Sequence, residues 1–194
     1  MSNSILSVAG LSKCFGEREL FFDLSFGLEK GQKMALVAKN GEGKTTLLEL
    51  LSGNQQADSG QVIWRNELKI AYLKQDTSYK KGTTIRDFFY EKSGGLADII
   101  REYQQSLNSP ENHDVMQRAI DKMHQVNAWD YQSKIEKLLT VFELDLNDWD
   151  TEIEILSGGQ KKRLALIQCL LLEADVFILD EPTNHLDVNM ISWL

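Results

Sequence analysis

The residues best suited to chemistry form a glycine-rich run from Ala38 to Thr46, with the sequence AKNGEGKTT. Its spacing matches the G-x-x-x-x-G-K-[ST] pattern of loops that bind nucleotide phosphates, except at the first position. Glycines let successive backbone N–H groups turn inward, while Lys44 reaches the terminal phosphates and the Thr45 hydroxyl ligates Mg²⁺. The run follows an apolar segment, Met34–Val37, predicted to be a buried strand, and opens a predicted helix through Leu51. An ordinary glycine-rich corner between a strand and a helix is the alternative interpretation.

Two residues of this run depart from the pattern. Ala38 stands where the first glycine is expected, and it fits only if its φ angle is negative. Glu42 brings a carboxylate close to the expected polyphosphate, which repels that charge unless the side chain points to solvent. We therefore expect the loop to keep its geometry and to bind nucleotide with altered affinity.

A second group of candidate residues follows the apolar run Val176–Leu179. This run has the composition of a strand buried on both faces, and Asp180-Glu181-Pro182 ends it where open α/β sheets place their ligands. Asp180 is the candidate Mg²⁺ ligand, and Glu181 is the candidate base that polarises the attacking water. The alternative is that two acidic residues merely terminate a buried strand.

The third group is Leu156-Ser157-Gly158-Gly159-Gln160, which precedes a predicted helix from Gln160 to about Leu172. Two glycines behind a capping serine leave bare N–H groups at a helix N-terminus, and such a terminus attracts anions. One nucleotide needs only one phosphate loop, so a second anion site would have a separate use. A plain serine-capped helix is the alternative.

Composition limits the class of protein. The chain has 194 residues, 42% hydrophobic and 26% charged, which suits one α/β core with at most a small appended subdomain. The net charge of −8 argues against nucleic-acid binding through bulk electrostatics. No apolar run reaches the length of a membrane span, and the N-terminus lacks the pattern of a secretory signal. Cys14 and Cys169 fit no metal spacing and indicate reduced thiols in a cytoplasmic protein.

The N-terminal part of the chain has the alternation of antiparallel β structure. Strands are predicted over Ile5–Ala9 and Leu20–Leu28, joined by a turn at Gly16–Arg18. The face predicted to be apolar in the second strand consists of Phe22, Leu24, Phe26 and Leu28. Beyond the phosphate loop, Ser52-Gly53 is predicted to end the helix, and two short strands are predicted over Gln61–Arg65 and Leu68–Leu73.

From Thr84 onward the period becomes helical. Apolar residues at helical spacing indicate one helix, and a further helix carries Ile135, Leu138, Leu139 and Phe142. The apolar face of the first of these helices consists of Leu96, Ile99, Ile100, Tyr103 and Leu107. Between the two, Ser109 is predicted as an N-cap with Pro110 at the first helical position.

The order of these motifs resembles the nucleotide-binding domain of the ATP-binding cassette (ABC) superfamily. The phosphate loop (Walker A) is followed by Gln75 after a strand, then LSGGQ, then FILDEP (Walker B), and the likeness covers the whole chain. The run Glu181–Asp187 resembles the ABC-F branch, whose members carry two cassettes in one chain, lack membrane spans and include translation factors acting at the ribosome. Asn127–Trp129 and Ile191–Leu194 also favour this branch.

This resemblance implies an α/β fold, a P-loop NTPase core of ABC type with an antiparallel β subdomain and a helical subdomain. The expected division is residues 1–83 for the β subdomain and the first part of the core, 84–150 for the helical subdomain, and 151–194 for the second part of the core, together forming one ABC ATPase domain. ATP and Mg²⁺ are the implied cofactors.

The resemblance also implies a role for each matching residue. Gln75 would sense the metal and the γ-phosphate, and Phe15 would stack on adenine, although Phe15 alone would be interpreted as a packed core aromatic. Ser157 and Gly159 would contact the γ-phosphate held by an opposite cassette. Asp187 would belong to the loop that couples the two sites, and His185 would be structural. The residues implied to contact the phosphates or Mg²⁺ are Asn40, Gly41, Gly43, Lys44, Thr45, Thr46 and, for the metal, Gln75 and Asp180.

We therefore expect an ATPase in which two cassettes close head to tail over two nucleotides, using Glu181, Gln75 and Lys44 for catalysis. The partners expected are a second cassette and, for an ABC-F protein, the ribosome. The chain stops seven residues after Asp187 and lacks the family's switch histidine, so it is expected to be a truncated N-terminal cassette with weak activity alone.

Two other functions remain open. One is the ATP-binding subunit of an ABC membrane transporter, which would need a partner with spans. The other is a cassette whose nucleotide binding only holds an assembly together. Between Gly94 and Ala128 acidic residues outnumber basic ones by five to three, which gives no support for RNA contact through this insert.

Overall fold

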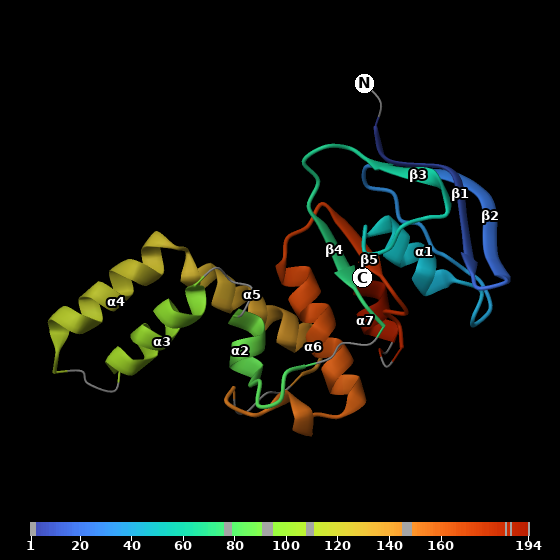
Figure 1. Cartoon of the computed structure of the whole chain (residues 1–194). Helices are drawn as coiled ribbons and strands as arrows, with labels where there is room; N and C mark the ends of the chain where they lie inside the picture. Colours follow the sequence, from blue (N-terminus) through green and yellow to red (C-terminus); the bar gives the residue numbers. More distant parts are fainter. Residues whose placement is uncertain are drawn as a thin grey trace. The chain divides into compact units, whose positions relative to one another are not determined.

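The computed structural model describes residues 3–75, 79–90, 95–107, 111–144, 149–184, 186 and 188–193 (Figure 1). The chain divides into two compact units. The first contains Met1–Gln75 and Leu172–Pro182, and the second contains Asp76–Leu171 and Thr183–Leu194. The division predicted from the sequence, into β subdomain, helical subdomain and core, stays a prediction.

The first unit is built on a three-stranded antiparallel sheet. Strands β1 (Ser4–Phe15), β2 (Arg18–Glu29) and β3 (Ser59–Trp64) lie in the order β2-β1-β3. Helix α1 (Lys44–Leu51) packs against this sheet through a shared apolar core (Figure 1). The buried members of that core are Leu6, Val8, Leu11, Leu47, Leu50, Leu51 and Ile178. The turn at Gly16 and the helix end at Ser52-Gly53 are as predicted, whereas β1 continues to Phe15, beyond the predicted end at Ala9.

The predicted apolar face of β2 is wrong at Phe22, whose side chain is 73% exposed, whereas Phe21 packs against the core. Leu11 pairs with Leu24 but Lys13 pairs with Phe21, so β2 carries one extra residue here. An extra residue in one strand forms a bulge and reverses the alternation of side chains beyond it. Asp23, with a φ of 50°, lies within this bulge.

The predicted strand at Met34–Val37 is also wrong. These residues have no regular secondary structure, and Val37 is 90% exposed. A strand requires a neighbour that accepts and donates its backbone hydrogen bonds, and apolar composition alone does not supply one. No described strand pairs with this segment.

A second, parallel sheet of the first unit consists of β4 (Ile70–Leu73) and β5 (Val176–Leu179). The register pairs Tyr72 with Ile178 and Leu73 with Leu179, so the two strands end side by side. Both strands were predicted, β5 with the same bounds. Phe177 is 38% exposed, so β5 is buried on one face and partly open on the other.

The second unit is helical, as predicted. It contains α2 (Ile85–Tyr90), α3 (Leu96–Leu107), α4 (His113–Gln125), α5 (Ala128–Val141), the short 3₁₀ helix η1 (Ile153–Ile155), α6 (Gly158–Leu171) and α7 (Val188–Trp193). Ile100 of α3 is buried, whereas Leu107 is 45% exposed. None of the helices in the described part of the chain is long and apolar enough to cross a membrane.

The predicted start of α4 is wrong. The helix begins at His113, and Asn112 is its N-cap, whose side chain accepts a hydrogen bond from the N–H of Val115. Ser109 and Pro110 lie outside the described residues. Asparagine and serine cap helices about equally well, so a sequence that offers both leaves the choice to tertiary packing.

Candidate functional site

The loop from Ala38 to Thr46 contains two glycines in the left-handed region and leads directly into α1. Gly41 and Gly43 adopt φ angles of 80° and 88°, which only glycine adopts at no steric cost. Gly43 is the N-cap of α1, and a Cβ atom there would lie 3.1 Å from the Cβ of Leu20. The φ of Ala38 is not positive, as the sequence required. Backbone N–H groups and a helix N-terminus are therefore combined in one turn.

Lys44 lies against this turn. Its Nζ donates hydrogen bonds to the carbonyl oxygens of Ala38 and Lys39, at 2.9 and 3.3 Å, and to Oδ1 of Asn40 at 3.2 Å. The ammonium group therefore shares one turn with the glycines. An anion that binds the loop's N–H groups would also meet this charge.

Glu42 is exposed, and its carboxylate turns back to the backbone. Its Oε2 accepts a hydrogen bond from the N–H of Lys39 at 3.0 Å. Glu42 is exposed, as its compatibility with phosphate requires. In addition, its carboxylate is hydrogen-bonded to a backbone N–H at the start of the loop.

The two parallel strands place Gln75 and Glu181 together. Gln75 lies two residues beyond β4, Glu181 lies two residues beyond β5, and Nε2 of Gln75 donates to Oε2 of Glu181 at 3.2 Å. Glu181 has a φ of 49°, in the left-handed region that a non-glycine residue seldom adopts. Such strain is common at functional sites, where the surrounding structure holds it in place.

Asp180 follows β5 directly and is only 3% exposed. Its N–H donates to the carbonyl oxygen of Leu73 at 3.0 Å, which fixes it at the end of the strand pair. Its Oδ2 is buried and has no hydrogen-bond partner among the described atoms. A buried carboxylate oxygen without a donor is costly unless a cation or water serves it, so this residue fits a hard cation such as Mg²⁺.

The described residues contain no group of three or more His, Cys, Asp and Glu side chains suited to a metal ion. Asp180 and the Thr45 hydroxyl, in the first turn of α1, would therefore supply only part of a coordination shell. Mg²⁺ accepts this readily, because it keeps several waters and takes further ligands from phosphates. Both are oxygen donors of the kind that Mg²⁺ prefers, so their chemistry fits Mg²⁺ that arrives with a nucleotide.

The Ser157 site lies in the second unit and is exposed. The Ser157 hydroxyl accepts from the N–H of Gln160 at 3.2 Å, and Oε1 of Gln160 accepts from the N–H of Ser157 at 2.9 Å. This is a reciprocal capping box, a role of Gln160 that the sequence reasoning missed although the S-x-x-Q spacing signals it. A Cβ atom at Gly158 would meet nothing within 4 Å, so the helix start is open.

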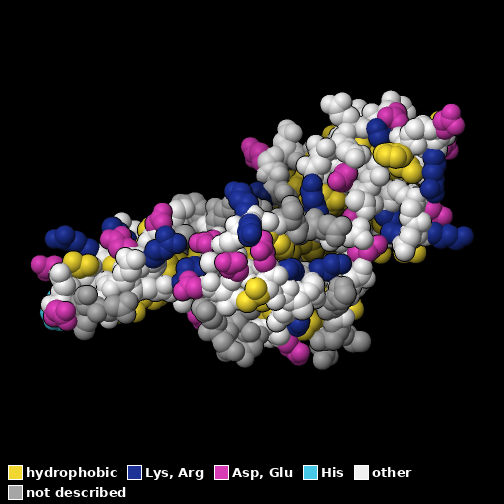
Figure 2. All heavy atoms as spheres, turned by 60° about the horizontal axis from the view of Figure 1, so that its bottom comes forward, with side chains coloured by type: hydrophobic (Ala, Val, Ile, Leu, Met, Phe, Trp, Pro, Cys, Tyr) yellow, Lys and Arg dark blue, Asp and Glu magenta, His cyan; other side chains and the backbone are white. Residues whose placement is uncertain are grey.

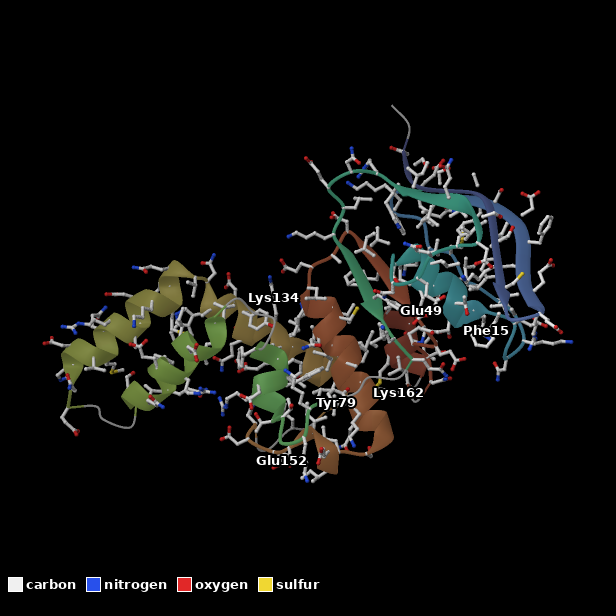
Figure 3. All side chains as sticks on the ribbon, viewed as in Figure 1. Phe15, Glu49, Tyr79, Lys134, Glu152 and Lys162 are labelled. Atoms are coloured by element: carbon white, nitrogen blue, oxygen red, sulfur yellow. The ribbon has the colours of Figure 1, made fainter. Side chains whose placement is uncertain are left out.

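Phe15 lies at the end of β1, beside the turn to β2 (Figure 3), and its side chain is 80% exposed. The alternative that Phe15 is a core aromatic is therefore wrong. An exposed ring at this position is available for stacking.

Four of the residues named from the sequence, Asp187, His185, Thr46 and Gly159, keep the status of predictions. Asp187 and His185 lie outside the described residues. Thr46 and Gly159 lie in α1 and α6, and their contacts with phosphate stay predictions.

Arg163 is a structural residue that the sequence did not lead us to expect. Its Nη1 donates to the carbonyl oxygens of Phe142 at 2.9 Å and Glu143 at 3.2 Å, which attaches α6 to the end of α5.

Comparisons with known proteins agree with these observations. A family model described as ABC transporter matches residues 21–184. The ABC transporter ATP-binding protein YfmR of Bacillus subtilis is 35% identical over 98% of this chain and 31% of its own length. ATP-binding protein Uup of Haemophilus influenzae is 32% identical over 98% of this chain and 30% of its own length. ABC transporter F family member 5 of Arabidopsis thaliana is 32% identical over 89% of this chain and 27% of its own length.

Solved structures give the same fold. The ATP-binding subunit of an ABC transporter matches with a TM-score of 0.69 and 20% identity, over 97% of this chain and 70% of that one. A nucleotide-free ATP-binding cassette from an ABC transporter matches with a TM-score of 0.58 and 21% identity, over 92% and 69% of the two chains. The predicted α/β cassette fold is therefore confirmed. The chain spans about a third of the length of the curated relatives that it matches.

Proposed function

The chain belongs to the ABC transporter family, and on that premise we propose that it binds Mg-ATP in the Ala38–Thr46 loop and hydrolyses it within a head-to-tail pair of cassettes. Cassettes of this family are ATPases in general and work as pairs. The observation that carries the proposal is the Lys44 ammonium, held on a turn of two left-handed glycines at the start of a helix. That combination of charge and backbone donors is suited to a triphosphate.

Glu181 is the proposed base. Its carboxylate would accept the proton of the attacking water, while Gln75, already hydrogen-bonded to it, would orient that water. Lys44 and the loop N–H groups would hold the phosphates and stabilise the charge that develops on them. Bound Mg²⁺, held by Asp180 and Thr45, would neutralise further phosphate charge.

Nucleotide binding can be tested by titrating the chain with a fluorescent ATP analogue in the presence of Mg²⁺. Lys44→Ala should weaken binding by about tenfold or more. Among the described residues, Lys44 is the one whose ammonium group is hydrogen-bonded to the loop, and the substitution removes it. Lys39→Ala is the matched control, since Lys39 serves the loop through main-chain atoms. Equal affinity of the Lys44→Ala variant and the wild type would contradict the proposal.

For the partner, we propose action of ABC-F type at the ribosome. Support comes from the ABC-F-like run Glu181–Asp187 and from relatives that include an ABC transporter F family member at 32% identity. The likeness to transporter subunits of known structure is at 20–21% identity and concerns the fold alone.

Co-sedimentation with ribosomes tests this partner. The protein carrying Glu181→Gln should sediment with ribosomes when Mg-ATP is present and not when nucleotide is withheld. Lys/Arg and Asp/Glu side chains are interspersed on the face drawn in Figure 2, so we expect binding to survive a moderate rise in salt. No ribosome binding in any condition would exclude this partner, and binding of equal strength with and without nucleotide would contradict ATP-dependent action at the ribosome.

A further inference from the structure

Two polar atoms are buried without a hydrogen-bond partner at the carboxyl end of the β4–β5 pair. One is Oδ2 of Asp180, and the other is the hydroxyl of Tyr72, among the atoms that the structure describes. Tyr72 pairs across the ladder with Ile178, and Asp180 lies two residues beyond Ile178, directly after β5. An unpaired donor and an unpaired acceptor are therefore buried in the same region of the first unit.

The ring of Tyr72 is held from several sides. It packs against the apolar core shared by β1 and α1, and Nζ of Lys74 lies 6.0 Å from the ring centroid. Because the ring is packed, the hydroxyl is not exposed to solvent and needs a hydrogen-bond partner inside the protein.

The charges near Tyr72 are carboxylates. Burial raises the pKa of Tyr72 to about 12, and Asp180 and Glu49 of α1 add to this rise. The phenol therefore stays protonated under physiological conditions and keeps its capacity to donate a hydrogen bond. Asp180 is two residues beyond Ile178, the ladder partner of Tyr72, and its N–H continues the ladder by donating to the carbonyl oxygen of Leu73, so strand alternation places the two side chains on the same face. No direct hydrogen bond joins them among the described atoms.

We propose that the Tyr72 hydroxyl is a positioning group for Asp180, joined to its carboxylate through one water molecule when Mg-ATP is bound. A bridging water molecule would satisfy both the unpaired Tyr72 hydroxyl and the unpaired Asp180 oxygen, and a buried water needs two or more such polar partners. Outer groups of this kind orient a metal ligand and raise the affinity for the metal. The inference rests on the proposed function, because it assumes that Asp180 serves Mg²⁺.

The test is Tyr72→Phe, which removes only the hydroxyl. Binding of a fluorescent ATP analogue is titrated with Mg²⁺, and we expect the variant to need about tenfold more Mg²⁺ for half-maximal binding. Binding in EDTA should be unchanged. The melting temperature of the metal-free variant should equal or exceed that of the wild type, because an unsatisfied buried hydroxyl has been removed.

Tyr131→Phe is the matched control. Its hydroxyl donates to the carbonyl oxygen of Phe89 at 2.7 Å in the other unit, so its loss should lower the melting temperature and leave the Mg²⁺ dependence unchanged. If wild type and Tyr72→Phe show the same Mg²⁺ dependence, this inference is overturned and the proposed function stands. If the wild type binds no nucleotide at any Mg²⁺ concentration, both this inference and the proposed function are contradicted.

Discussion

Glu42 is the most unusual residue of the phosphate loop, and its carboxylate is held by the N–H of Lys39. The contact directs the charge of Glu42 to the loop's own backbone, which would make an acidic residue compatible with the proposed phosphate site. Ala38 is tolerated for a simpler reason, since its φ is not positive. Neither the Glu42 contact nor the φ angle of Ala38 could be predicted from the motif, because a motif specifies residue types and not hydrogen-bond partners or backbone angles.

Replacing Glu181 with Gln should separate hydrolysis from binding. The amide keeps the size and the contact position of the side chain near Gln75 but cannot accept a proton from water. Turnover should fall by about 100- to 10,000-fold while the affinity for Mg-ATP changes little. Phosphate release measured at saturating ATP provides the check, and normal turnover would exclude Glu181 as the base.

Asp58 should make stability depend on pH in the acid range. The Lys13 hydrogen bond at 2.7 Å, with a second from the N–H of Cys14, holds the pKa of Asp58 below its ordinary value of 3.8. A lowered pKa adds stability that is present above that value and is lost as the pH falls through the pKa of the folded state. Asp58→Asn should therefore lower the melting temperature slightly near neutral pH, and the difference should vanish in acid. A constant difference would contradict this.

Helix α6 begins at the exposed Ser157 cap and also carries Arg163, whose side chain contacts the end of α5. Ser157 and Gly158 are exposed at the start of α6, and further along the helix Arg163 donates to carbonyl oxygens at the end of α5. The position of the cap therefore depends on a side chain that is not part of LSGGQ.

Arg163→Ala should destabilise the second unit. It removes a charged donor from two carbonyl oxygens, which costs about 2 kcal/mol. Arg163→Lys should recover part of this loss, because its ammonium can still reach one acceptor. Urea unfolding of the three proteins gives the comparison, and equal midpoints would show that the contact carries no stability.

The elements best predicted from sequence are those whose signals are local. Strand β5 was predicted with its observed bounds, because an apolar run between polar residues needs little else to define it. Met34–Val37 is also wholly apolar, but a strand requires a partner that composition cannot reveal. Phe22 was misplaced by a one-residue bulge, which no alternation pattern announces. Of the candidate site, Gln75 and Glu181 were both named, but the bond between them depends on the β4–β5 register.

In the proposed function, the two units of the chain contribute to the binding of different nucleotides. Lys44, Asp180 and Glu181 belong to the first unit, and Ser157 belongs to the second, where its helix start is exposed. One nucleotide can use the first set of residues, so the exposed Ser157 site is free to serve the nucleotide of a second cassette.

The most direct test of this division is the mass of the Glu181→Gln chain in solution, measured by sedimentation equilibrium. With Mg-ATP the mass should rise from 22.1 kDa toward twice that value, and without nucleotide it should not. Adding Ser157→Glu, which places a negative charge at the helix start, should abolish the rise and leave nucleotide binding intact. A chain that binds Mg-ATP yet keeps the mass of one chain at every concentration would contradict the account.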